Sequence, residues 1–206
     1  MAIRIASLRP QDHTALVEFA RTGMHFGRYV PNVWLARLYA RSFLYQELAQ
    51  ATIALGAYGE GDRFLGALLA RLDDEAPLGL SWCQRLYQRV YGVAERLLAT
   101  GTESAYDRAN AEMLAAYRER HDVDGELLFL AADPDSGARG VGTALLDALR
   151  DRARGRNLYL YTDDACTWQF YERRGFSRIG ARTIDIPGTK GRATGVMECY
   201  LYAGTL

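Results

Sequence analysis

Two short segments of this 206-residue chain carry residues whose types and spacing could bind an anion and donate a proton. The first begins at Asp133, in a turn, and continues through Gly137, Gly140 and Gly142 into a predicted helix. The first N–H groups of a helix have no internal partner, and the helix dipole places partial positive charge there. Glycine lets the backbone approach a phosphate without a Cβ in the way. The segment therefore predicts a pyrophosphate-binding loop.

The spacing of these glycines excludes two common nucleotide-binding motifs. It is GxxGxG, the reverse of the dinucleotide fingerprint GxGxxG, and no Gly-Lys-Ser/Thr follows as in a nucleotide P-loop. A glycine-rich turn alone is a weak signal. The second segment, Phe170-Tyr-Glu-Arg-Arg-Gly-Phe176, follows about 30 residues later and makes the pattern much more specific.

With both motifs in tandem, residues 126–180 resemble the GCN5-related N-acetyltransferase (GNAT) superfamily. The core of that family is a strand, a pyrophosphate loop, a helix, a strand and a helix that ends in a segment of the FYERRGF type. The flanking elements also suit the family, so the resemblance covers most of the chain except residues 78–122, which we interpret as an insertion.

The resemblance implies acetyl-CoA as co-substrate and a strand that lends its backbone to the pantetheine arm. The family usually has Gln or Arg where Gly137 stands, a departure that predicts a less pre-organised loop, and Arg139 could add positive charge at the phosphates. The implied pantetheine-binding residues are Leu130, Ala131 and Ala132, and the implied pyrophosphate cradle is Gly137, Ala138, Arg139, Gly140, Val141, Gly142 and Thr143.

The second motif implies further contacts and a catalytic acid. Asp164 and Thr167 stand where the family often has Asn and Ala, and both are candidate cofactor-binding residues; a carboxylate such as Asp164 can accept a hydrogen bond but cannot donate one. Tyr171 occupies the position of a recurrent tyrosine that protonates the departing thiolate, a role for which a phenol is suited. The alternative is a buried aromatic residue with a satisfied hydroxyl.

The acceptor amine must lose a proton before it can attack, because amines are mostly protonated at neutral pH. Glu126, at the start of a predicted strand, is our first candidate for the base, and an exposed strand-entry residue is the alternative. We expect direct attack on the thioester, with a strand N–H near Leu130 as oxyanion donor. Cys166 as an acyl carrier is the less favoured scheme. The other candidate carboxylates are Asp73, Asp74, Glu75 and Glu198.

Apolar periodicity predicts the elements that position these residues. Asp12 is a predicted helix cap, and a second cap is predicted at Ser104. Predicted strands cover residues 3–8, 52–58, 64–72, 126–132, 157–162, 176–186 and 196–202; predicted helices follow Asp12 and cover residues 33–49, 80–99, 104–121, 140–154 and 166–174.

The order of these elements predicts an α/β fold: a GNAT-like mixed, mostly antiparallel sheet of about seven strands flanked by helices. A helical hairpin at about 78–122 is inserted between the third and fourth strands and would shape either the acceptor pocket or a dimer contact. The aromatic-rich segment between Gly23 and Pro31 could form an edge of the cleft or pack on the sheet. We predict a single acetyltransferase domain over residues 1–206.

The composition of the chain limits the classes of molecule that it is expected to bind. The 25 basic and 25 acidic residues balance, which argues against nucleic acid and against acidic membrane surfaces. Three separated cysteines predict free thiols, and three scattered histidines give no metal-site spacing. Without a signal peptide or an apolar membrane-spanning stretch, a cytoplasmic protein is expected. The expected acceptor is a small-molecule amine; a peptide or protein N-terminus, a non-catalytic acyl-CoA sensor and a homodimer remain open.

Overall fold

The computed structural model describes residues 2–24, 32–98, 102–187 and 193–206. Most of the aromatic segment that we considered as a cleft edge lies outside these ranges, as do residues 188–192, between the last two predicted strands. None of the helices in the described ranges combines the length and the apolarity needed to cross a membrane.

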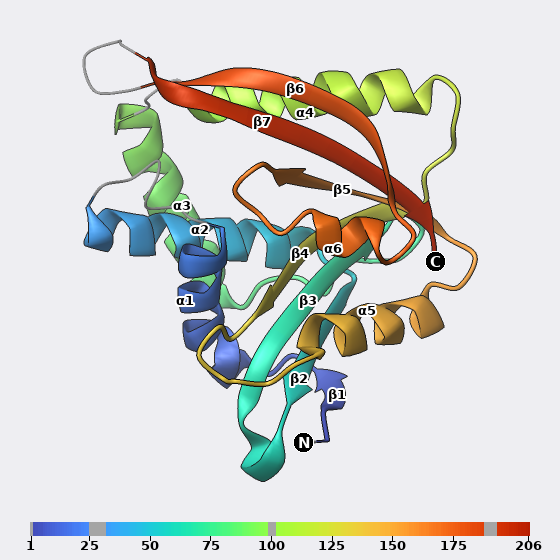
Figure 1. Ribbon diagram of the computed structural model, residues 1–206. Coiled ribbons are helices and arrows are strands. Elements are labelled where there is room, and N and C mark those ends of the chain that lie inside the picture. Colours follow the sequence, from blue (N-terminus) through green and yellow to red (C-terminus); the bar gives the residue numbers. More distant parts are fainter. Residues whose placement is uncertain (1, 25–31, 99–101, 188–192) are drawn as a thin grey trace.

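A seven-stranded sheet with the order β1-β2-β3-β4-β5-β7-β6 forms the centre of the protein (Figure 1). Every neighbouring pair is antiparallel except β4 and β5, which are parallel. The predicted mixed, mostly antiparallel sheet is therefore confirmed. The strands are β1 Arg4–Ser7, β2 Ile53–Tyr58, β3 Phe64–Leu72, β4 Gly125–Ala132, β5 Asn157–Asp163, β6 Ser177–Pro187 and β7 Ala193–Thr205.

Helices cover both faces of the sheet. The helices α3 and α4 come between β3 and β4 in the chain, where the sequence predicted a helical hairpin; in space α3 lies beside α2, and α4 runs along β6 and β7 (Figure 1). The helices are α1 His13–Gly23, α2 Val33–Gln50, α3 Trp82–Leu98, α4 Thr102–Arg118, α5 Val141–Arg152 and α6 Gln169–Glu172, with 3-10 turns at η1 Pro10–Asp12 and η3 Glu60–Asp62.

Three apolar clusters attach α1, α2, α4 and α5 to the sheet. Leucines of α5 pack on one face, against side chains of β3, β4 and β5. On the opposite face, α1 and α2 pack against Leu69 and Phe129, and α4 packs through Met113 against Tyr159 and β7. The α2 and α4 layers therefore lie side by side on one face, and α5 lies on the other.

Asp12 is the N-cap residue of α1, as predicted, but its predicted capping bond is missing, and two other predicted helix boundaries are wrong. The Asp12 carboxylate makes no capping bond to α1, because it accepts hydrogen bonds from Arg9 and Tyr58 instead. Ser104 lies inside α4, which begins at Thr102. The helix predicted at 166–174 shrinks to Gln169–Glu172, since Cys166 is still in a turn whose amide bonds back to Asp163.

The two halves of the sheet separate between β4 and β5. These strands pair only at Gly125–Leu158 and Glu126–Tyr159, and then diverge (Figure 1). On its other side β4 carries a bulge: the register with β3 passes from Leu69–Phe129 to Ala70–Leu127, so Leu128 has no counterpart. A bulge bends and twists its strand. Its position just past Glu126 explains why β4 leaves β5 there.

Candidate active site

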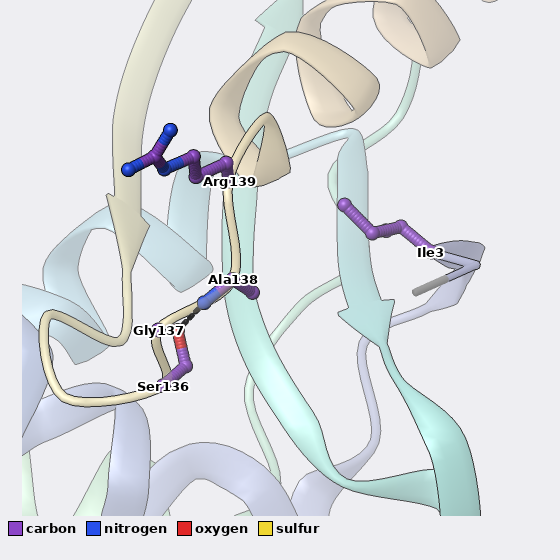
Figure 2. Close-up of a pocket in the computed structure, with 5 residues that line it drawn as sticks. All are labelled: Ile3, Ser136, Gly137, Ala138 and Arg139. Carbon is purple, nitrogen blue, oxygen red and sulfur yellow. Dashed lines mark hydrogen bonds between the residues drawn. The ribbon is translucent and has the colours of Figure 1, made fainter.

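The loop after β4 is held by its own side chains and by Arg63, the residue just before β3. The Asp133 carboxylate accepts from the Asp135 amide at 2.9 Å and pairs with Arg63 at 3.2 Å. The Ser136 hydroxyl accepts from the Ala138 amide at 3.2 Å, as the dashed line in Figure 2 shows. The Ala138 N–H is therefore already bonded within the loop. A hollow of about 350 Å³ beside the loop is lined by Ile3 and residues 136–139 (Figure 2).

The N-terminus of α5 is open. Gly140 at the N-cap has a φ of 81°, which favours glycine, and no side chain caps the helix. The amides of Val141, Gly142 and Thr143 are the first of the helix and lack intrahelical acceptors. A phosphate could therefore be bound by these amides together with the helix dipole. In Figure 2 the Arg139 side chain extends away from Ile3.

The second motif docks on this helix end. A Cβ on Gly142 would lie 3.4 Å from the Phe170 ring and 3.9 Å from Leu130 Cδ2, so α6, α5 and β4 meet there. The Arg174 guanidinium donates to the Thr143 hydroxyl and lies 4.9 Å over the Phe170 ring. This places a positive charge beside the first turn of α5.

Arg174 was missed as a site residue at the level of sequence. Arg174 belongs to the FYERRGF-type segment, but no feature of the neighbouring sequence indicates that its side chain contacts Thr143, 31 residues earlier. Its Nε is buried without a hydrogen-bond partner in the described part of the chain.

Glu126 lies at the vertex of the divergence between β4 and β5. Arg71 is its register partner on β3, and Tyr159 is its partner on β5. The Tyr159 hydroxyl donates to Glu126 Oε2 at 2.9 Å, and Arg71 Nη2 lies 3.2 Å from the same oxygen. Burial raises the pKa of Glu126, although the hydrogen bond from Tyr159 and the charge of Arg71 oppose the shift. The exposed strand-entry alternative is therefore wrong, since its side chain is 14% exposed.

Tyr171 lies on the α5 face of the sheet. Its ring contacts Phe170, Phe176 and Tyr202, and it packs against the α5 cluster. Burial, and secondly the nearby Cys166, raise its pKa, so the phenol stays protonated at neutral pH. No hydrogen bond from its hydroxyl to another side chain or to the backbone is found within the described residues, so the hydroxyl can donate to a bound molecule. The catalytic role of Tyr171 and the buried-ring alternative both stay predictions.

The remaining predicted residues fall into two groups. Leu130, Ala131 and Ala132 pair with β3 on one side and have no β5 partner on the other, so their outer edge faces the gap. Asp164 and Thr167 are exposed in the turn between β5 and α6.

The other carboxylates have partners of their own. Asp73 pairs with Arg71, Asp74 with Arg156 and Glu75 with Arg152, while Glu198 accepts from the Tyr200 hydroxyl. Glu126 is also paired, so these contacts do not separate it from the others; it is the stronger candidate for the base because only Glu126 lies at the last position where β4 and β5 pair.

Cys166 is poorly suited to carry an acyl group. Burial, followed by the Asp163 carboxylate, raises the pKa of its thiol to about 12. Because the thiolate is the nucleophile, such a cysteine is largely unreactive at neutral pH.

A family model identifies the class of protein. The model of the Acetyltransferase (GNAT) family matches residues 25–176. The chain belongs to the GNAT acetyltransferase family. None of the curated proteins matches the chain.

Solved acetyltransferases share the fold over the whole chain. A histone acetyltransferase-related acetyltransferase from Corynebacterium glutamicum is 18% identical with a TM-score of 0.59, and 100% of this chain and 98% of that one are covered. A Drosophila melanogaster polyamine N-acetyltransferase is 13% identical with a TM-score of 0.57 and full coverage of both chains. An N-acetyltransferase from Thermoplasma acidophilum, in complex with coenzyme A, is 15% identical with a TM-score of 0.52 and full coverage of both. At these levels of sequence identity, the comparisons show that the fold is shared.

The GNAT loop offers a matched test of phosphate binding. Gly140 and Gly155 have φ values of 81° and 80°, and a Cβ on either would meet open space. Each glycine-to-alanine change should cost about 1–2 kcal/mol of stability, because an L-residue is strained in this region. Only Gly140→Ala should also weaken acetyl-CoA binding, by about tenfold in Kd, since Gly155 follows the far end of α5. Calorimetric titration checks this; equal Kd values for the two variants would contradict it.

A second, partly buried carboxylate, which sequence reasoning also missed, interacts with Glu126. Glu47, in the last turn of α2, accepts from Gln50 Nε2 at 3.0 Å, and Gln50 Oε1 accepts from Arg71 at 2.7 Å. Burial, and then the neighbouring Glu126 carboxylate, raise the pKa of Glu47 to about 8. No local pattern marks this residue, because its environment depends on how α2 packs over β3 and β4.

Glu47 should make the protein less stable as the pH rises. Its pKa is raised from an ordinary 4.5 to about 8, so the unfolded chain loses this proton first. The stabilisation by the neutral form is complete below about pH 4.5 and is lost as the pH rises towards 8. Since Glu47 keeps some solvent exposure, we expect Glu47→Gln to recover about 1–2 kcal/mol at pH 8 and little at pH 4.5. Denaturant unfolding at both pH values measures this; an equal effect at both would contradict it.

Proposed function

We propose that this GNAT protein transfers the acetyl group of acetyl-CoA to a primary amine of a small molecule by direct attack on the thioester. The observation that carries the proposal is the divergence of β4 from β5 just past Glu126, beside the open N-terminus of α5. The gap offers an unpaired strand edge, and the helix end offers amides to a pyrophosphate.

The residues around the gap fit acetyl-CoA as substrate. Val141, Gly142 and Thr143 supply first-turn amides, with Arg139 and Arg174 as neighbouring cations. The amides of Gly137 and Gly140 complete the cradle. The Ala138 amide already donates to the Ser136 hydroxyl, so its role is to hold the loop in shape. Asp164 and Thr167, exposed beside α6, would contact the outer part of the pantetheine arm.

Leu130, Ala131 and Ala132 offer the edge of β4 to the pantetheine arm, which would bind much as an added strand does. A backbone N–H near Leu130 would then donate to the oxygen that gains negative charge during attack.

Glu126 and Tyr171 are proposed to handle the two protons of the reaction. The amine nitrogen forms a bond to the acetyl carbon as the carbon–sulfur bond breaks. Glu126 takes the proton that the amine releases, and Tyr171 gives its proton to the departing thiolate. The two side chains lie on opposite faces of the sheet, Glu126 with α2 and α4 and Tyr171 with α5. The acceptor amine and acetyl-CoA would therefore reach the gap from opposite sides of the sheet.

Two measurements test the proposal. Acetyl-CoA should raise the melting temperature of the protein, and a panel of small amines should release free thiol from acetyl-CoA. Turnover restricted to peptide N-termini would favour the peptide or protein acetyltransferase alternative. A thermal shift without thiol release from any amine would favour a non-catalytic acyl-CoA sensor, and no thermal shift at all would reject acyl-CoA binding.

A further inference from the structure

The contacts of Glu126 are divided unequally between its two oxygens. Both the hydrogen bond from the Tyr159 hydroxyl, 2.9 Å long, and the ion pair with Arg71 Nη2, at 3.2 Å, reach Oε2. Oε1 accepts no hydrogen bond within the described part of the chain, yet it is not among the buried atoms that lack a partner. Oε1 therefore keeps some contact with solvent, while Oε2 is held.

The groups that hold Oε2 are themselves fixed. Arg71 Nη2 also donates to the Tyr159 hydroxyl at 3.0 Å, so the three groups close a ring of contacts. Arg71 Nη1 donates to Gln50 on α2, and Arg71 Nε pairs with Asp73 at 3.1 Å. The guanidinium is thus tied at each of its nitrogens, and it can shift little relative to the sheet.

The register of the strands places Arg71, Glu126 and Tyr159 side by side. Arg71, Glu126 and Tyr159 are direct neighbours across β3, β4 and β5, at the last position where β4 and β5 pair. Directly opposite residues point to the same face and lie within reach of one another. The row therefore crosses the vertex of the gap, and the open oxygen of Glu126 is presented where the strands part.

We propose that Arg71 and Tyr159 are positioning residues that hold Glu126 by Oε2, so that Oε1 is the atom that takes the proton of the acceptor amine. This inference rests on the proposed function for its consequence in catalysis. The two contacts of Arg71 and Tyr159 with Glu126 Oε2, which we call the clamp, are present in the free protein. The Tyr159 hydroxyl donates to the ionised form of the carboxylate and favours it, while Arg71 adds a neighbouring positive charge.

Tyr159→Phe and Tyr161→Phe form a matched pair for the test. Tyr161 lies on the same strand two residues on, and the two rings are in edge contact at 5.5 Å. Both variants lose one phenolic hydroxyl from the same region, but in the structure only Tyr159 donates to Glu126. The probe is the carboxyl carbon of Glu126 in protein with labelled glutamate, followed by NMR against pH and assigned by its absence in Glu126→Gln.

The expected result is that Tyr159→Phe raises the pKa of Glu126 by about one unit, a tenfold change in its acid equilibrium, and that Tyr161→Phe changes it by less than a third of that. With a saturating amine, the acid limb of kcat should move in the same direction in Tyr159→Phe. An unchanged titration of Glu126 in Tyr159→Phe, or an equal shift in Tyr161→Phe, would overturn the clamp.

A separate outcome of this experiment tests whether Oε1 accepts the proton. If the carboxyl titration shifts as expected but the acid limb of kcat does not follow it, the clamp exists and the catalytic part of the inference is wrong. If the wild-type protein releases no thiol with any amine, the proposed function fails, and the titration still decides whether the clamp is present.

Discussion

Replacing Glu126 with glutamine should lower kcat/KM for the amine acceptor by about a hundredfold to ten-thousandfold at pH 7.5, the range over which a positioned acid or base contributes. The glutamine keeps the shape of the side chain and can still contact Arg71 and Tyr159, but it cannot take a proton. Acetyl-CoA should bind with nearly the same Kd, because Glu126 lies on the face away from α5. Steady-state thiol release and calorimetric titration measure the two effects.

Glu119→Gln is the control for this change. Glu119 is an exposed residue just after α4, so its substitution removes the same charge without touching the row across the strands. A kcat/KM for Glu126→Gln within about threefold of that for Glu119→Gln would show that another group accepts the proton, because such a ratio is far below the contribution of a general base.

Replacing Tyr171 with phenylalanine should lower kcat by about a hundredfold, the lower end of the range for acid catalysis, with little change in the KM for acetyl-CoA. The phenol is kept protonated by burial, so it can donate to a thiolate at any pH near neutral. Its ring contacts with Phe176 and Tyr202 do not involve the hydroxyl, so the fold should be unaffected.

Tyr45→Phe provides a matched comparison for Tyr171→Phe. Tyr45 lies on α2, its ring stacks edge-on against Tyr87 at 5.4 Å, and no hydrogen bond from its hydroxyl is found in the described part of the chain. Both variants should therefore unfold at similar denaturant concentrations. If Tyr171→Phe keeps the kcat of Tyr45→Phe, the departing thiolate obtains its proton from water or from another side chain.

Most of the fold could be predicted from the sequence because its elements are marked locally. Alternating or continuous apolar residues identify β1 to β5, and the apolar 3.6-residue period of α3 indicates a helix before any contact is known. Side-chain contacts were predicted less well where a side chain has a choice of partners: Asp12 is the N-cap residue of α1, as predicted, but makes no capping bond. It bonds to Arg9 and Tyr58 instead, a choice that depends on β2 lying nearby.

The candidate site was only partly accessible from sequence. The glycine loop and Tyr171 belong to motifs that are continuous in the chain, and Glu126 could be placed because it begins a strand. Arg71, Tyr159 and Glu47 belong to no motif: Arg71 and Tyr159 are 88 residues apart, and register alone brings them together. The roles of all these residues stay predictions, whereas the sheet, its mostly antiparallel order and the family are established.

The position of acetyl-CoA in a crystal structure of the complex tests the central claim most directly. We expect the pyrophosphate at the first amides of α5, the pantetheine arm along the free edge of β4, and the thioester sulfur within about 3–3.5 Å of the Tyr171 hydroxyl, the separation of groups poised to react. Glu126 Oε1 should face the same gap from the opposite side of the sheet. A pantetheine arm that binds outside the gap between β4 and β5, with the thioester remote from both side chains, would contradict the account.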